Sequence, residues 1–464
     1  MSTHHTLRAM AGALLATATA ISLVGCSGGG GNTGSTSTTT TTTAASSSSA
    51  TTTTAPSSTS SGEKVTLEFW DMSWGPAGKY DVKAKELVAK WNADHPNIQV
   101  NYTMNTWDNW YQTFAQAVAA GTAPDVSTGG GFQPFGLQQD ANAILPLNPL
   151  IDKWKSDGTA NDFSDGMLDY YKDKDGNYLA VPWGMDIRVW FYREDLLQKA
   201  GVAVPTTYDE LKKACDAVHA LGADTYGIAD GGTPHWTFMQ GIANGAGMFD
   251  KNGQPQLTTN PKELDALKYI ASMGQGGSGC INPTATTVSQ DDAIAMFDQG
   301  KAAFVMDSPG FGPHVSADTL KVAKVLPPMA NADGQKLGLY FVNGIMAYKQ
   351  TKHPQEAMQF IEYWSSIGGD LISAGASAVS PRKSIDSNPA FDSQPLYRES
   401  VKAWGPPIGQ PLYAQAPNGF GAMNTIDGDP TMLDLERALF AGTPSVEAAA
   451  AAAQAKLEEF VKPK

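Results

Sequence analysis

The chain has 464 residues, more than a typical single domain, so two domains are the default expectation. Hydrophobic residues make up 42% and charged residues 17% of the composition, which is typical of a globular protein with a large core. The formal net charge is −14, and the sequence contains no cluster of Lys and Arg. Because a polyanion is bound through clustered basic side chains, the composition argues against nucleic-acid binding.

The first 25 residues have the pattern of an export signal. Arg8 gives a weakly basic start, and the apolar run 9–24 is too short for a comfortable membrane span. The run ends Leu23-Val24-Gly25-Cys26, which resembles the bacterial lipoprotein box, where the cysteine is lipidated and becomes the mature N-terminus. This resemblance implies lipidation at Cys26; ordinary cleavage beside an incidental cysteine is the alternative.

Segment 26–62 consists almost wholly of Ser, Thr, Gly and Ala and has neither aromatic nor charged residues. Such a composition cannot bury enough apolar surface to offset its ordering entropy. The sequence therefore predicts a disordered spacer between a membrane anchor and the folded domains.

From Val65 onward, short strands alternate with amphipathic helices. Strands are expected at 65–70 and 98–102 and again from Pro124, and helices at 80–91 and 110–118. This alternation predicts a doubly wound α/β domain with a mostly parallel sheet.

The stretch from Tyr178 to Asp195, YLAVPWGMDIRVWFYRED, is expected to cross between two domains. Two apolar strands, 178–182 and 187–192, follow each other with a break at Trp183-Gly184 and no turn long enough to fold one back on the other. The same alternation of strands and helices continues beyond it, and the apolar run 338–348 is expected to be the return crossover.

Two further cysteines, Cys215 and Cys280, lie in the part of the chain expected to fold. In an exported protein they could form a disulfide, but Cys215 falls on the apolar face of a predicted helix, where a free buried thiol is equally plausible. No grouping of His and Cys has zinc spacing.

Several aromatic and charged residues follow predicted strands, at the edge where open α/β sheets bind ligands. A sugar needs a flat aromatic ring under its apolar face and charged or amide groups around its hydroxyls. The candidate ligand-binding residues are Trp70, Asp71, Trp74, Trp107, Asp125, Trp183, Asp186, Arg188, Trp236, Phe311 and Asn343.

Structural roles compete with these functional ones. Trp70 could belong to the core, Asp125 could bind loop amides, and Arg188 could pair with a carboxylate as a structural lock. The tryptophans assigned to packing are Trp91, Trp110, Trp154 and Trp364.

Five motifs point to one family. Residues 121–126 (GTAPDV) are similar to a GxxPDV signature, 178–196 to a crossover segment, 205–211 (PTTYDEL) to P-x-T-W-x-E-L, 300–304 (GKAAF) to GKAAM, and 353–357 (HPQEA) to NPEAA. In this order and spacing, from about Val65 to Val461, they resemble the extracellular solute-binding proteins of ABC importers, in the sugar-binding, maltose-binding-protein-like branch.

Two departures from the family pattern are visible. Many members have Gly-Pro-Trp after the GKAAM strand, whereas this chain has Ser308-Pro309-Gly310-Phe311, so the stacking aromatic residue is shifted or missing. Tyr208 replaces the Trp of the later motif and is expected to pack in the core.

The resemblance implies a type II periplasmic-binding-protein fold, an α/β class with two doubly wound lobes joined by a multi-segment hinge. Lobe 1 is expected to comprise 63–186 and 342–380, and lobe 2 187–341 and 381–464. It also implies a protein that captures a mono- or oligosaccharide without a cofactor and delivers it to a permease. With a lipid at Cys26, it would be anchored to the outer face of the bacterial cytoplasmic membrane.

Two other functions stay open. An exported glycan-acting enzyme is disfavoured because the chain has neither a nucleophile elbow nor a metal motif. The same fold could instead bind a polyamine or a peptide, since Trp70, Asp71, Trp74 and Asp186 also suit a cationic ligand.

Overall fold

The computed structural model describes residues 64–107, 110–250, 252–394, 396–411 and 422–461. The predicted export signal, the spacer and the lipidation site at Cys26 lie outside these ranges. Within them, no helix combines the length and apolar character that a membrane crossing requires.

The folded chain alternates strands with helices, as the sequence predicts. The strands are β1 (Val65–Met72), β2 (Ile98–Asn105), β3 (Val126–Gly129), β4 (Val181–Ile187), β5 (Val189–Arg193), β6 (Tyr226–Ala229), β7 (Ala302–Asp307), β8 (Ala323–Val325), β9 (Gly338–Ala347) and β10 (Gly409–Pro411). The α-helices are α1 (Tyr80–Asp94), α2 (Trp110–Ala120), α3 (Gln133–Ala141), α4 (Asn148–Asp157), α5 (Glu194–Ala200), α6 (Tyr208–His219), α7 (His235–Ala243), α8 (Pro261–Ala271), α9 (Gln290–Asp298), α10 (Ala317–Val322), α11 (Pro354–Ser366), α12 (Gly368–Ser373), α13 (Lys383–Asp386), α14 (Tyr397–Trp404), α15 (Ala422–Asp427), α16 (Thr431–Ala441) and α17 (Val446–Val461). The 3₁₀ turns are η1 (Thr159–Asp162), η2 (Leu168–Tyr171), η3 (Pro283–Thr286), η4 (Pro309–His314) and η5 (Pro389–Ser393).

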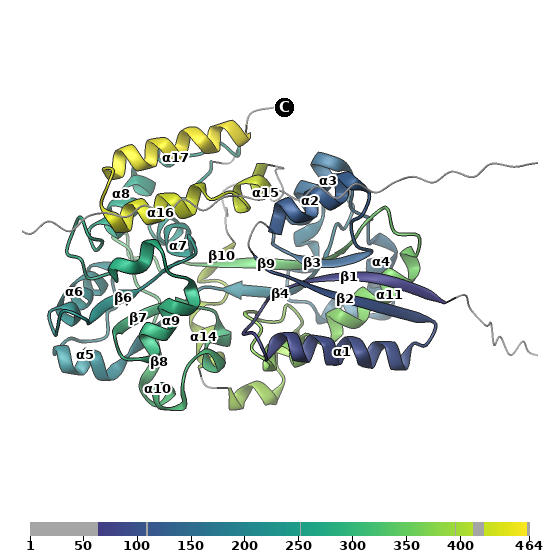
Figure 1. The fold of residues 1–464 in the computed structure, drawn as a ribbon, viewed down its shortest axis with the longest axis horizontal. Helices are drawn as coiled ribbons and strands as arrows, with labels where there is room; N and C mark the ends of the chain where they lie inside the picture. The colour runs from purple at the N-terminus through teal and green to yellow at the C-terminus, as the bar shows by residue number, and fades with distance from the viewer. Residues whose placement is uncertain (1–63, 108–109, 251, 395, 412–421, 462–464) are drawn as a thin grey trace, which may run out of the picture. The chain divides into compact units, whose positions relative to one another are not determined.

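The first sheet has the order β10-β9-β3-β1-β2, and β4 also pairs with β9. Strand β1 is parallel to both β2 and β3, whereas β9 is antiparallel to β3 and β4. Strand β9 is also parallel to β10, so three of the five strand pairings are parallel, in line with the prediction, and two are antiparallel. The reason is that β9 returns from the second sheet and enters at the edge where the parallel strands end. Helix α1 lies on one side of these strands and α2 and α3 on the other (Figure 1).

The second sheet has the order β6-β7-β5-β8. Strand β7 is parallel to β6, and β5 is antiparallel to both β7 and β8, so this sheet is mixed as well. Around it are α5, α6, α9 and α10, and the C-terminal helices α16 and α17 run side by side (Figure 1).

The predicted crossover between the sheets is confirmed, but its break lies elsewhere. Strand β4 belongs to the first sheet and β5 to the second, and only Arg188 separates them. The break was expected at Trp183-Gly184, yet both residues lie within β4, where the pairing with β9 shifts register between Pro182 and Gly184. The glycine therefore marks an irregularity in a continuous strand and not its end.

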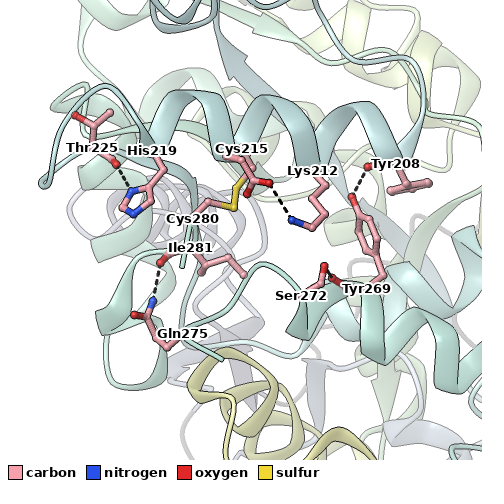
Figure 2. The surroundings of a disulfide bond; sticks show 11 residues. Tyr208, Lys212, Cys215, His219, Thr225, Tyr269, Ser272, Gln275, Cys280 and Ile281 are labelled. Carbon is pink, nitrogen blue, oxygen red and sulfur yellow. Dashed lines mark hydrogen bonds and ion pairs between the residues drawn. A yellow bond between two sulfur atoms is a disulfide. The ribbon is translucent and has the colours of Figure 1, made fainter. Parts of the chain in front are cut away.

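A disulfide joins Cys215 of α6 to Cys280, with their Cα atoms 5.7 Å apart, which settles the alternative left open by the sequence. Both cysteines are fully buried. The backbone carbonyl of Cys280 accepts hydrogen bonds from the amides of Gly227 and Ile228 in β6. The disulfide therefore ties α6 to a segment that pairs with the edge of the second sheet. Nearby, the hydroxyl of Tyr269 in α8 donates to the backbone carbonyl of Tyr208 in α6 at 2.6 Å (Figure 2).

Candidate functional site

One large cavity, of about 640 Å³, is lined by residues that follow strands of both sheets. Its lining includes, from the first sheet and the helices around it, Ser73, Trp74, Gly75, Met104, Thr106, Trp107, Trp110, Gly130, Phe341, Asn343 and Ser377. It also includes, from the crossover, the second sheet and the later helices, Asp186, Arg188, Thr233, His235, Phe238, Gln290, Asp291, Asp307, His314, Ile426, Asp429 and Met432. The first group is rich in aromatic residues, and the second holds almost all the charged ones.

The aromatic wall is a set of rings that hold one another edge to face. The ring centroids of Trp74 and Trp107 lie 4.8 Å apart at 78°, and those of Trp107 and Trp110 lie 5.7 Å apart at 77°. Trp74 also donates from Nε1 to the hydroxyl oxygen of Thr128 at 3.0 Å. Such packing fixes the orientation of the rings before any ligand arrives.

Two ion pairs also contribute to the lining of the cavity. Arg188, the residue between β4 and β5, donates to the carboxylate of Asp186. Burial raises the pKa of Asp186, and the Arg188 charge opposes this shift. Asp307 is the last residue of β7, and its Oδ2 lies 2.9 Å from Nδ1 of His314 at the end of η4. Burial alone would lower the pKa of His314, but the Asp307 carboxylate and other neighbours outweigh it and raise that pKa.

A second histidine, His235, begins α7 and also lines the cavity. Burial and the nearby Arg188 charge hold the pKa of His235 well below its usual range. The ring is therefore neutral at physiological pH and can both donate and accept a hydrogen bond.

Four buried polar atoms of the cavity lining have neither a hydrogen-bond nor an ion-pair partner among the described residues. They are Oδ1 of Asp186, Nε of Arg188, Nδ1 of His235 and Nδ2 of Asn343. An unpaired buried polar group is costly, so such a group normally has a partner in the functional state of a protein. Because the set mixes donors and acceptors, it suits a ligand whose groups can do both, as hydroxyls can.

Five of the eleven residues predicted from the sequence line this cavity: Trp74, Trp107, Asp186, Arg188 and Asn343. Four different segments bring them together, namely the ends of β1 and β2, the crossover, and β9. Asn343 lies opposite Gly184 in the pairing of β9 with β4. Their contact with a ligand stays a prediction.

Two predicted carboxylates are used inside the protein instead. Asp71 is fully buried and accepts hydrogen bonds from the hydroxyls of Thr128, Tyr80 and Tyr102. Burial raises the pKa of Asp71 to about 6 although these hydrogen bonds oppose the shift. Asp125 accepts from the backbone amide of Glu68 at 2.8 Å and from the Thr351 hydroxyl at 2.6 Å, so it has a structural role, although the amide belongs to strand β1 and not to a loop as the alternative expected.

Two predicted aromatic residues of the first sheet lie behind the cavity wall. Trp70 packs its ring on Phe114 at 5.5 Å, as the core alternative expected. Trp183 is 2% exposed and meets Trp74 edge to face at 5.0 Å, so it supports a cavity residue without lining the cavity itself. Because Trp183 lies within continuous strand β4, its side chain alternates into the core.

The two aromatic platforms expected from the second sheet are core residues as well. Trp236 is 1% exposed, and its Nε1 donates to Oε1 of Gln240, one turn further along α7. Phe311 stacks on Phe191 at 4.1 Å and is fully buried. Neither lines the cavity, so the shifted aromatic of the Ser308–Phe311 segment does not replace the missing one there.

Sequence reasoning missed several lining residues. Trp110 was assigned to helix packing, which is correct for most of its surface, but its remaining edge reaches the cavity. His235 follows the glycine pair after one predicted strand, and His314 follows strand β7. Their positions after predicted strands were a usable signal. Met432 comes from α16, far along the chain, and no local pattern could have placed it here.

Metal binding finds no support in this site. Across the part of the chain that the structure describes, no group of three or more His, Cys, Asp or Glu side chains is arranged to hold a metal ion.

The architecture is that of the two-lobed binding proteins. A sugar transporter from Arthrobacter chlorophenolicus A6, solved with bound laminaribiose, is similar to this chain at 29% identity with a TM-score of 0.78, covering 86% of this chain and all of that one. Maltose-bound MalE3 of T. maritima matches with a TM-score of 0.72 at 18% identity, over 86% of this chain and 100% of that one. The predicted fold, two α/β lobes of the maltose-binding-protein type, is confirmed.

Residues 77–370, more than half of the chain, match the family model for bacterial extracellular solute-binding proteins, and the protein belongs to that family. Among curated relatives, YcjN of Escherichia coli (strain K12), provisionally named an ABC transporter periplasmic-binding protein, is 23% identical over 81% of this chain and 89% of its own. An uncharacterized lipoprotein from the oleD 5' region of Streptomyces antibioticus is 28% identical over 64% of this chain and 66% of its own. The prediction of a binding protein and not an enzyme is confirmed by this membership.

Proposed function

We propose that the protein captures a carbohydrate in the cavity between its two sheets and delivers it to the permease of an ABC importer. One observation carries the proposal: fixed tryptophan rings and buried, partnerless donors and acceptors line the same cavity. The apolar face of a pyranose can stack on the tryptophan rings, and its hydroxyls can pair with the donors and acceptors. The laminaribiose and maltose bound in the two solved relatives support this ligand class.

The mechanism we infer is closure of the two lobes around the ligand. The lobe boundaries expected from the sequence, at 186/187, 341/342 and 380/381, are part of this proposal. Sugar that contacts both walls would stabilise the closed form over the open one, and only differential affinity for the two forms can drive closure. The side chains that would hold the sugar are the five predicted residues of the cavity together with His235 and His314.

Association with a permease and with the membrane is also part of the proposal. The name of YcjN supports the ABC transporter partner. The Leu23-Val24-Gly25-Cys26 motif and the Streptomyces lipoprotein relative support lipid attachment at Cys26 and a location on the outer face of the cytoplasmic membrane. Incorporation of labelled palmitate into the wild type and its loss in Cys26→Ala would test the anchor.

A cationic ligand is the competing cargo, because four carboxylates line the cavity. Two of them already pair with cationic partners, Asp186 with Arg188 and Asp307 with His314. A third, Asp429, accepts a backbone N–H of α16. Since two of the four carboxylates already have a cationic partner, the cavity favours a neutral ligand over a polyamine.

A thermal-shift and calorimetric screen tests the cargo. Wild-type protein would be measured with glucose, laminaribiose, maltose, putrescine and spermidine, because a ligand that binds only the folded state raises the melting temperature. We expect shifts with saccharides and none with amines. Asn343→Ala should weaken saccharide binding about tenfold or more, since Nδ2 loses its role as a donor. Asn101→Ala, at an exposed position of β2, is the matched control. Shifts with the amines alone would overturn the carbohydrate assignment.

A further inference from the structure

Asp71, near the end of β1, is the centre of a buried hydrogen-bond network that reaches the cavity lining. Asp71 does not line the cavity itself and is fully buried. Four donors converge on its carboxylate: the hydroxyls of Thr128, Tyr80 and Tyr102 at 2.6, 2.8 and 3.1 Å, and the backbone amide of Met72 at 3.0 Å. An ionised carboxylate only accepts hydrogen bonds, so this set of donors suits the ionised form.

The Thr128 hydroxyl connects this carboxylate to the cavity. It donates its one hydrogen to Asp71, and its oxygen accepts from Nε1 of Trp74 and from the backbone amide of Met72, both at 3.0 Å. A hydroxyl has one hydrogen to donate and two lone pairs, so these three bonds use its full capacity. Trp74 lines the cavity, and its Nε1 can only donate. The bond from Trp74 therefore requires that the Thr128 hydrogen points to Asp71.

The charge of Asp71 sets the direction of that hydrogen. A carboxylate attracts a hydroxyl hydrogen in a strong, charge-assisted bond, and the 2.6 Å distance from Thr128 is short, as such bonds are. A proton on Oδ1 of Asp71 would instead point at Thr128. A proton on Oδ2 would displace the hydroxyl of Tyr80 or Tyr102 and leave Thr128 a neutral acceptor. Protonation of Asp71 at either oxygen therefore loosens the support of Trp74.

Trp74 depends on this support because it follows β1 in a loop, where no strand or helix fixes its side chain. Its ring also meets Trp107 and Trp183 edge to face, with centroids 4.8 and 5.0 Å away. These ring contacts restrain the position of the indole, whereas the bond from Nε1 to Thr128 is directional and restrains its rotation.

We propose that Asp71 is a positioning residue for ligand binding: its carboxylate orients the Thr128 hydroxyl, which in turn holds Trp74 in the orientation that lines the cavity. The inference rests on the proposed function and deepens it, because it assigns control of ligand affinity to a group that does not touch the ligand. The affinity then depends on whether Asp71 is ionised.

The environment of Asp71 places this dependence in an accessible pH range. Burial raises the pKa of Asp71 to about 6, although the hydrogen bonds it accepts oppose the shift. The titratable groups that face it are the hydroxyls of Tyr80 in α1 and Tyr102 in β2, and Thr128 in β3 does not titrate. Burial and then the Asp71 carboxylate raise the pKa of both tyrosines, and Asp81 in α1 adds to this at Tyr102. Both tyrosines therefore remain donors below pH 8.

Ligand affinity should be complete well above pH 6 and fall as the pH drops below it. If only the form with ionised Asp71 binds, about one protein molecule in ten is competent at pH 5. The affinity at pH 5 should then be up to about tenfold lower than at pH 7.5.

A purely structural role of Asp71 predicts a different pH dependence. Because its pKa is raised, its contribution to the free energy of unfolding is fully present below the ordinary value of 3.8 and is lost as the pH rises toward 6. Stability from this group thus falls with rising pH, whereas the proposed effect on ligand affinity rises. The two roles are distinguished by slopes of opposite sign.

The first test is calorimetric titration from pH 5 to 7.5 with laminaribiose or maltose, whichever raises the melting temperature of the wild type more. Asp71→Asn should bind with one affinity at every pH, about as weakly as the wild type at pH 5. Tyr102→Phe removes a hydrogen bond that lowers the pKa of Asp71, so it should move the midpoint of the affinity curve to higher pH.

Substitutions in β3 test the link to Trp74. Thr128→Val keeps the shape but leaves Nε1 of Trp74 without its acceptor, and should weaken binding about fivefold or more at pH 7.5. Thr128→Ser keeps the hydroxyl and should remain within about twofold of the wild type. Ser127→Ala is the matched control, because it removes a buried hydroxyl of the same strand that pairs with Tyr348 and not with Asp71. It should match the wild type at every pH.

A second measurement needs no ligand. In protein labelled with ¹⁵N at its tryptophans, the Nε1–H resonance of Trp74 is identified by its loss in Trp74→Phe. This resonance should titrate with a midpoint at about pH 6 in the wild type and stay constant over the same range in Asp71→Asn.

Three results would overturn the inference: equal affinities of the wild type at pH 5 and 7.5, a pH dependence that Asp71→Asn retains, or wild-type binding by Thr128→Val. Failure of the proposed function is distinguishable, because then no saccharide binds, and the Trp74 resonance alone decides: a titrating resonance supports the positioning role, and a constant one refutes it. If Asp71→Asn does not fold, Tyr102→Phe and Thr128→Val carry the same test.

Discussion

A buried carboxyl in helix α8 should make the stability of the protein fall as pH rises. Glu263 in α8 is 2% exposed, and its Oε2 has no hydrogen-bond partner among the described residues. The carboxyl packs against Gly241 of α7 so closely that a Cβ there would lie 2.5 Å from Oε2. Burial raises the pKa of Glu263 from 4.5 to about 8.

The sign of the effect follows from proton linkage. Between the ordinary pKa and the raised one, the folded protein keeps a proton on Glu263 that the unfolded chain has lost. The contribution of Glu263 to the free energy of unfolding is fully present below pH 4.5 and is lost as the pH rises toward 8. The slope is about 1.4 kcal/mol per pH unit for one proton, and the loss over the whole interval is at most about 5 kcal/mol.

Glu263→Gln should remove this slope, because the amide keeps the shape of the protonated carboxyl and does not titrate. Urea unfolding at half-unit steps from pH 5 to 8 would give the free energy of unfolding of both proteins. Asp230 and Glu436 are also buried with raised pKa values, so the wild-type curve contains their effects too. The quantity to compare is therefore the difference between wild type and variant, which should widen by about 1.4 kcal/mol per pH unit in favour of the variant.

Asp265→Asn removes a charge from an exposed position of the same helix and is the control for net charge. Parallel curves for the wild type and Glu263→Gln would refute the reasoning. They would mean that the carboxyl is ionised in the folded protein and that water or a cation compensates it.

The remaining predictions concern the disulfide, the crossover and a glycine. Replacing both Cys215 and Cys280 by alanine opens a loop of 65 residues and should lower the free energy of unfolding by about 4 kcal/mol on the chain-entropy estimate, measured in urea. Because the disulfide is fully buried, a phosphine reductant should leave the folded wild type unchanged, and rapid reduction would contradict this. Arg188→Met should cost about 3 kcal/mol by leaving Asp186 buried without its partner, and Asp186→Asn in the same protein should restore part of that loss in a double-mutant cycle. Gly344→Ala should cost about 1–3 kcal/mol, since its Cβ would lie 2.9 Å from the Tyr171 ring, and an unchanged urea midpoint would show that the ring yields.

Much of the fold could be read from local patterns. The alternation of short strands with amphipathic helices from Val65 onward is a local property, and the strands and helices formed close to the predicted positions. The crossover was also visible, because two apolar strands without an intervening turn cannot pair with each other. Its break lies at Arg188, four residues beyond Gly184, since a glycine signals irregular backbone but does not say whether the strand continues beyond it.

The candidate site was predicted in part, and the reason differs between residues. Position after a strand correctly placed Trp74 and Trp107 at the cavity, because β1 and β2 are parallel and bring their carboxyl ends to one edge, whereas Asp186 reaches the cavity from within β4. The same rule failed for Asp71, which also ends a strand but lies inside a cage of hydroxyls from Thr128 and its neighbours. Which way a side chain points at the end of a strand depends on partners far away in the chain.

The sequence by itself determined the α/β class, the family and the segments that approach the cavity, because these depend on local periodicity and on motifs in a fixed order. Only the tertiary structure decided that Cys215 pairs with Cys280, that Trp183 supports Trp74 from behind, and that Met432 joins the lining. Each of these is a contact between residues distant in the chain. Its existence is set by how helices and sheets pack, for which a single sequence carries no local signal.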